Sequence, residues 1–223
     1  MDGPTIQARI YRGYGIAAEK IGLPYVHYRP QSAGPPIIDA NKLATLPASF
    51  NAEDFTYMRP NKYGKPTWFA IVDGSQTQVG DYLVGPGGTF FIAGQQPLLP
   101  ILAVECNRSI RIGRMADQGD AGFVGYSGDV QSEEIDVLGT SATGGTFGAG
   151  WPASILLGGR SDKDVVLPSS VKQSGVVILL PASVPVQIVE SDIAQDDLGR
   201  NFAIYAAELT DLGWRLQANE EHS

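Results

Sequence analysis

Cys106 is the one thiol in the chain, and His27 and His222 are its two histidines. A cysteine nucleophile needs a nearby base to convert the thiol into a thiolate. Cys106 lies in an apolar stretch that predicts a strand, and His222 lies in a C-terminal tail that we expect to fray. Free cysteine in such a strand is typical of a small buried hydrophobe. We therefore predict that Cys106 packs in the core and does no chemistry.

Three aspartates near the C-terminus have some of the character of a calcium loop. Asp192, Asp196 and Asp197 precede Gly199, but their spacing is not that of an EF-hand and the distal glutamate is missing. Asp and Gly are also the residues of hairpin turns, and this is our interpretation. The sequence contains no CxxC, no HExxH and no histidine pair at ligand spacing, so we predict no metal and no cofactor.

An acidic pair and two glycine-rich stretches have simpler explanations than catalysis or phosphate binding. Glu133 and Glu134 are adjacent, which places them on different faces of a strand and is typical of a solvated charge run. A carboxylate pair for glycoside hydrolysis stays open, because two acids can meet from distant parts of a chain. The glycine-rich stretches 85–88 and 145–150 precede no helical pattern, so they lack the helix N-terminus that a phosphate cradle requires.

Composition narrows the classes of protein. The 223 residues include 27 Gly and 15 Pro, which indicates many turns, and the formal net charge is −8. An acidic surface repels a phosphate backbone, so direct sequence-specific nucleic-acid binding is disfavoured. A single cysteine fits a reducing compartment. The N-terminus has no signal-peptide pattern, and the most apolar run, Val176–Pro185, is too short to cross a bilayer.

An internal repeat organises the elements expected around these residues. Gly80–Arg108 reads as strand, glycine-rich turn and further strands, and Ser191–Asn219 repeats its pattern at an offset of about 111 residues. Identical residues at this offset predict equivalent hairpin positions in two β-modules. The pairs are Asp81 with Asp192, Gly88 with Gly199, Phe91 with Phe202, and Leu98 with Leu209.

The N-terminal part reads differently from the repeat. Residues 5–21 carry apolar side chains at helical spacing, with Asp2 or Thr5 as a cap and Gly22 as the end. Residues 23–66 contain seven prolines, which predict a long extended arm without regular structure. Its aromatic residues argue against disorder, so we expect the arm to pack on its own modules and on a neighbouring subunit.

The predicted fold is therefore mainly β, with two small β-barrel or sandwich modules, a possible internal duplication, an N-terminal helix and a Pro-rich extended arm. We divide the chain into a helix and arm (1–66), a first β-module (67–116), an acidic Gly-rich excursion (117–150) and a second β-module (151–223).

Several long segments resemble a family of proteins encoded in structural-gene clusters of tailed phages and prophages of proteobacteria. The segments are IYRGYGIAAEKIGLPYVHYRP, LPASFNAEDFTYMRPNKYGKPTWFAIVDG, VGDYLVGPGGTFFIAGQQPLLPILAVECNR and DDLGRNFAIYAAELTDLGWRL. The similarity covers most of the chain, apart from residues 117–150. A looser similarity, carried by the Gly80-Asp81 hairpin and its repeat, is to head-closure and tail-completion proteins, which are small β-barrels.

The resemblance implies a non-enzymatic virion protein of the neck or tail, assembled in the host cytoplasm. Its partners would be copies of itself and other neck, tail or fibre proteins, without membrane insertion. The alternatives are a tail-fibre anchor or host-surface adhesin that binds through residues 117–150, and a tail-associated hydrolase. The candidates for subunit contacts are Ile10, Tyr14, Tyr25, Tyr28, Phe50, Phe55 and Tyr57.

Overall fold

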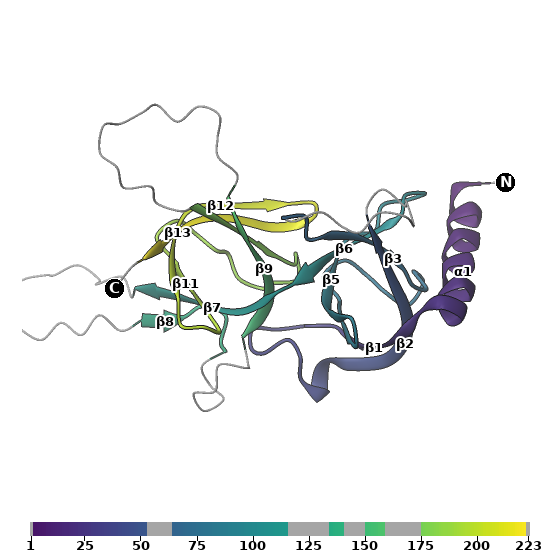
Figure 1. Cartoon of the computed structure of the whole chain (residues 1–223), viewed down its shortest axis with the longest axis horizontal. Coiled ribbons are helices and arrows are strands. Elements are labelled where there is room, and N and C mark those ends of the chain that lie inside the picture. Colours follow the sequence, from purple (N-terminus) through teal and green to yellow (C-terminus); the bar gives the residue numbers. More distant parts are fainter. Residues whose placement is uncertain (1, 53–63, 116–133, 141–149, 159–174, 222–223) are drawn as a thin grey trace, which may run out of the picture.

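The computed structural model describes residues 2–52, 64–115, 134–140, 150–158 and 175–221. Most of these residues lie in antiparallel strands that form two sheets, and one helix stands at the N-terminal end of the molecule (Figure 1). The prediction of a mainly β fold that contains a barrel and begins with a helix is confirmed.

Helix α1 (Gly3–Ile21) begins and ends at signals present in the sequence. The Asp2 carboxylate accepts a hydrogen bond from the Thr5 amide at 3.3 Å, which satisfies one of the unpaired donors of the first turn. The helix ends at Gly22, whose backbone is extended and whose amide donates to the carbonyl oxygen of Ala18, and a β-carbon there would lie 2.5 Å from that oxygen. The helix lies against strands β2 (Lys42–Ala52) and β3 (Thr67–Ile71), with Ala18 buried.

The first barrel is closed and contains six strands in the order β1-β2-β3-β6-β5-β4. Its core is formed by apolar side chains that alternate along these strands, as a half-buried strand requires. The strands are β1 (Leu23–Tyr28), β2 (Lys42–Ala52), β3 (Thr67–Ile71), β4 (Tyr82–Gly85), β5 (Gly88–Gly94) and β6 (Ile101–Cys106), and a 3-10 turn, η1 (Asp39–Asn41), precedes β2.

The expectation that residues 23–66 form an arm without regular structure is wrong for most of the residues in this range that the structure describes. Strands β1 and β2 belong to the first barrel. Two prolines are tolerated because Pro24 and Pro47 lie opposite each other in the β1–β2 register. Neither proline faces a third strand, because β4 pairs with β1 only at Val26–Tyr28 and β3 pairs with β2 only at Ser49–Ala52. The amide hydrogens that proline lacks are therefore not needed for pairing with β3 or β4.

The second sheet also returns on itself. Its order is β11-β12-β13-β10-β9-β7-β8, and β11 pairs in addition with β7, so we call it the second barrel. Short β8 lies beside the end of β7. The strands are β7 (Arg108–Met115), β8 (Glu134–Asp136), β9 (Trp151–Leu157), β10 (Gly175–Leu180), β11 (Ile193–Asp196), β12 (Asn201–Thr210) and β13 (Gly213–Glu221).

These strands divide the chain differently from the sequence-based division. The first barrel begins at Leu23, and a single residue, Asn107, separates its last strand from the first strand of the second barrel. The acidic stretch 117–150 contributes β8, and most of it lies outside the described residues. Among the described residues, no helix has the length and apolarity needed to cross a membrane.

Candidate functional site

Asp81 is the centre of a buried polar cluster in the first barrel. Its side chain is about 1% exposed. Its carboxylate accepts two hydrogen bonds of 2.8 Å from the Arg29 guanidinium, one of 2.9 Å from the Gln78 amide, and lies 2.7 Å from Nε2 of buried His27. Arg29 also donates to the carbonyl oxygen of Gln76. The cluster therefore ties the loop before β4 to the end of β1.

Asp192 has equivalent arginine and amide partners in the second barrel. The Arg114 guanidinium donates to both of its carboxylate oxygens at 2.7 and 2.9 Å, and the Val189 amide donates at 2.9 Å. Arg114 reaches the carbonyl oxygen of Gln187, five residues before Asp192, just as Arg29 reaches Gln76, five residues before Asp81. The two barrels thus share one arrangement, which we call the Asp–Arg clasp.

Strand pairing extends this correspondence over the whole of both barrels. Strand β1 pairs with β2 and β4, and β7 pairs in the same way with β8, β9 and β11. The remaining strands correspond in chain order: β3, β4, β5 and β6 match β10, β11, β12 and β13. The sequence Pro-Ala-Ser occurs at residues 47–49 and 152–154 and supports this match. In it, Pro47 and Ala48 pair with β1 at the positions where Pro152 and Ala153 pair with β7.

The offset changes by one residue at the hairpin turn. Before the turn, Tyr82 matches Ile193, but the second hairpin has one more turn residue, so Leu83 pairs with Phe90 and Ala194 pairs with Phe202. Phe202 therefore corresponds to Phe90, whereas the constant offset predicted a match with Phe91. Beyond the turn, Ile92 and Ile204 donate to the carbonyl oxygens of Asp81 and Asp192, which sets the offset there at 112 residues.

The two predicted turn glycines both have a positive φ angle, although the turns differ in length. Gly88 and Gly199 have φ angles of 122° and 78°, where a residue with a side chain is strained. The Asp196 carboxylate accepts hydrogen bonds from the amides of Leu198 and Arg200 and from the Arg200 guanidinium. Asp196 therefore organises the turn.

The described residues hold no group of three or more His, Cys, Asp or Glu arranged to bind a metal ion.

Charges inside the first clasp stabilise one another. Burial by itself would raise the pKa of Asp81, but the hydrogen bonds from Arg29, His27 and the Gln78 amide hold that pKa below its usual value. The hydrogen bond to Asp81 raises the pKa of Arg29 in turn. Sequence reasoning considered His27 only as a base for Cys106 and missed Arg29. In the second barrel the position of His27 is occupied by Ile112, opposite Ala194 as His27 is opposite Leu83.

Polar and aromatic contacts join the barrels into one unit. The Tyr82 hydroxyl donates to the carbonyl oxygen of Pro152 at 2.8 Å, and its ring lies edge-on to buried Trp151. Asn107 donates from its side chain to the Ile155 carbonyl oxygen at 2.8 Å and accepts from the Ile155 amide at 2.9 Å. A single apolar core runs from Tyr82 and its neighbours into the second barrel. The one-residue link is thereby fixed to β9 of the second barrel.

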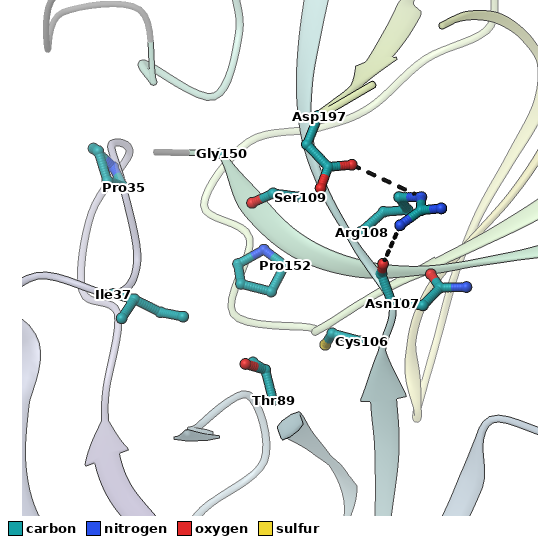
Figure 2. Close-up of a pocket in the computed structure, with 10 residues that line it drawn as sticks. All are labelled: Pro35, Ile37, Thr89, Cys106, Asn107, Arg108, Ser109, Gly150, Pro152 and Asp197. Carbon is teal, nitrogen blue, oxygen red and sulfur yellow. Dashed lines mark hydrogen bonds and ion pairs between the residues drawn. The ribbon is translucent and has the colours of Figure 1, made fainter. Parts of the chain in front are cut away.

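A cleft of about 320 Å³ lies at this junction. Figure 2 shows Pro35 and Ile37 on one wall, with Ser109 and Pro152 facing them and Cys106 below. Burial raises the pKa of the Cys106 thiol, so it stays protonated at neutral pH. His27 is bonded to Asp81. Among the described residues, no histidine activates Cys106.

Most of the predicted subunit-contact residues that the structure describes pack in or against one of the two cores. Tyr14 and Phe50 pack against that core, and Tyr25 is buried in it. Tyr28 packs against the second core, and Ile10 is half-buried. Phe55 and Tyr57 lie outside the described residues. Tyr25 and Phe50 contact each other edge to face within the chain, and their contact with another subunit stays a prediction.

Comparisons of the chain with protein-family models, with curated proteins and with solved structures give no match.

Proposed function

We propose that this chain is a non-enzymatic structural protein of the neck or tail of a tailed phage, acting through contacts with copies of itself and with other virion proteins. The proposal is supported by the resemblance of four long segments to phage structural-cluster proteins. The observation that carries it is the junction of the barrels, where Asn107 and one shared core hold two barrels as a single body. A fixed spacing between two modules suits a component that is repeated in a symmetric assembly.

The contacts of the two Asp–Arg clasps favour a structural role for their charged groups. The histidine and the two buried carboxylates form hydrogen bonds inside the barrels, and an arginine neutralises each carboxylate. Such saturated clusters hold loops in place. The adhesin alternative depends on residues 117–150, of which the structure describes only 134–140 and 150.

The test is a particle that lacks the protein. A stop codon early in the gene, with and without a complementing plasmid, should yield heads and tails that fail to join or tails that stay incomplete under the electron microscope. Antibody labelling of complemented particles should place the protein at the neck or tail. Normal, infective particles without the protein would overturn the proposal. Degradation of cell wall or polysaccharide by the purified chain would favour the hydrolase alternative.

A further inference from the structure

Helix α1 has two faces, and the barrel uses only one of them. Tyr11, Tyr14 and Ala18, spaced as i, i+3 and i+7, face the first barrel. Gly13, Ile16 and Lys20 have the same spacing but start two residues later, which turns them by about 200° around the axis. Ile16 is 54% exposed, and the Lys20 side chain is exposed as well. In Figure 1 this helix forms one end of the molecule.

Gly13 is the residue on the outer face that the fold of the chain does not explain. Glycine is the least favourable residue in a helix interior apart from proline. At Gly15 the need is clear, because a β-carbon there would lie 3.2 Å from the Asp73 side chain. At Gly13 a β-carbon would meet nothing within 4 Å in the described part of the chain. A bare backbone beside an exposed isoleucine is suited to close approach by another molecule.

The excess of acidic residues lies in the C-terminal half of the chain, whereas exposed basic residues lie on the helix. Residues 1–107 contain equal numbers of acidic and basic side chains, 8 of each, whereas residues 108–223 contain 16 acidic and 8 basic ones. The tip of the β12–β13 hairpin combines acid with apolar surface. There Leu209 is 57% exposed and Asp211 is exposed, and on the helix the basic Arg12 is exposed beside Gly13.

We propose that the outer face of α1 binds the β12–β13 hairpin of a second copy of this chain. Leu209 packs into the gap over Gly13 beside Ile16, and Arg12 pairs with Asp211. The helix and the hairpin lie apart within one molecule (Figure 1), so the contact joins two copies. Because the two surfaces differ, it is head-to-tail, and such contacts close into rings or extend into filaments. This inference rests on the proposed function, and it specifies which two surfaces of the chain form the contact between copies.

Self-association of the full chain, measured by sedimentation over a range of concentrations, tests the contact. Gly13→Ala should weaken association about tenfold or more, because the added methyl group fills the gap. It should leave the melting temperature of the dilute protein unchanged or raised, because alanine favours the helix. Gly3→Ala is the matched control: it adds the same methyl group in open space at the start of the helix and should not change association.

Charge reversal tests the pairing. Arg12→Glu and Asp211→Arg should each weaken association, and the double variant should restore it. The inference is overturned if Gly13→Ala weakens association no more than Gly3→Ala, if the double variant stays as weak as the single ones, or if the wild-type chain remains monomeric at every concentration. Placement of the protein in particles is measured independently, so the proposed function stands or falls separately.

Discussion

Asp81 and Asp192 hold the same position in two successive barrels, each bound by two hydrogen bonds from an arginine at or near the end of the strand that opens its barrel. In each barrel the carboxylate also receives an amide hydrogen bond from the residue three positions earlier. The clasp thus fastens the loop before a hairpin to the opening strand. The barrels differ in one partner, because His27 adds a further hydrogen bond to Asp81.

Removing either carboxylate charge should destabilise the chain. In Asp81→Asn, Arg29 and His27 lose a buried partner, and breaking such a pair costs about 3–5 kcal/mol. Asp192→Asn should cost less, because the Arg114 side chain is 38% exposed and water screens its charge. Urea denaturation at pH 7 measures both. Asp39→Asn, at an exposed position, is the control and should stay within about 0.5 kcal/mol of wild type. A loss no larger than the control would contradict the clasp's role.

Stability should fall in acid because of Asp81. Its pKa is held below the usual value in the folded chain and returns to about 3.9 on unfolding, so the unfolded chain binds the proton first as the pH falls. The contribution of this group is present at neutral pH and is lost as the pH drops below about 4. Denaturation curves between neutrality and acid should show a shallower decline for Asp81→Asn than for wild type. Equal slopes would contradict the prediction.

His27→Ile gives the first barrel the residue of the second at this position. Arg29 still satisfies Asp81 in this variant, so we expect a loss of about 1–3 kcal/mol, the scale of one hydrogen bond to a charged group. The loss should be smaller than for Asp81→Asn in the same denaturation assay. If the two losses are equal, the histidine, and not the arginine, is the partner that holds the carboxylate.

Asn107 should control the stiffness of the junction. Asn107→Ala removes both side-chain hydrogen bonds to Ile155, at a cost of about 1–3 kcal/mol, and should speed exchange of the Ile155 amide hydrogen. Asn107→Asp is a comparison variant, because it keeps the acceptor for that amide, loses the donor and places a negative charge beside the Ile155 carbonyl oxygen. Hydrogen exchange followed by mass spectrometry measures the difference. Unchanged exchange in Asn107→Ala would mean that the core alone fixes the barrels.

Cys106 should react slowly. Burial raises its thiol pKa, so alkylation of the native protein near pH 8 should be at least about tenfold slower than in urea, where the thiol is exposed. Mass spectrometry of timed samples measures the rate. Cys106→Ser should cost about 1–3 kcal/mol. Equal rates in the native and unfolded chains would contradict the prediction, and a faster native rate would show an activated thiol.

Local sequence patterns determined several features. The Asp2 cap and the spacing of apolar residues predict α1, since both act within a few residues of each other. The repeated Asp and Gly mark Asp81 and Asp192, because each carboxylate accepts a hydrogen bond from the amide three residues earlier in its own loop.

Only the tertiary structure decided the rest. Pro24 and Pro47 are compatible with strands because they face each other, and this depends on a register between residues far apart in the chain. Phe202 is equivalent to Phe90, and not to Phe91, because the second hairpin turn has one added residue. His27 and Arg29 reach Asp81 across more than fifty residues, so no local pattern joins them. Closure of each barrel brings such residues together, because it pairs the opening strand with a strand that is much later in the chain.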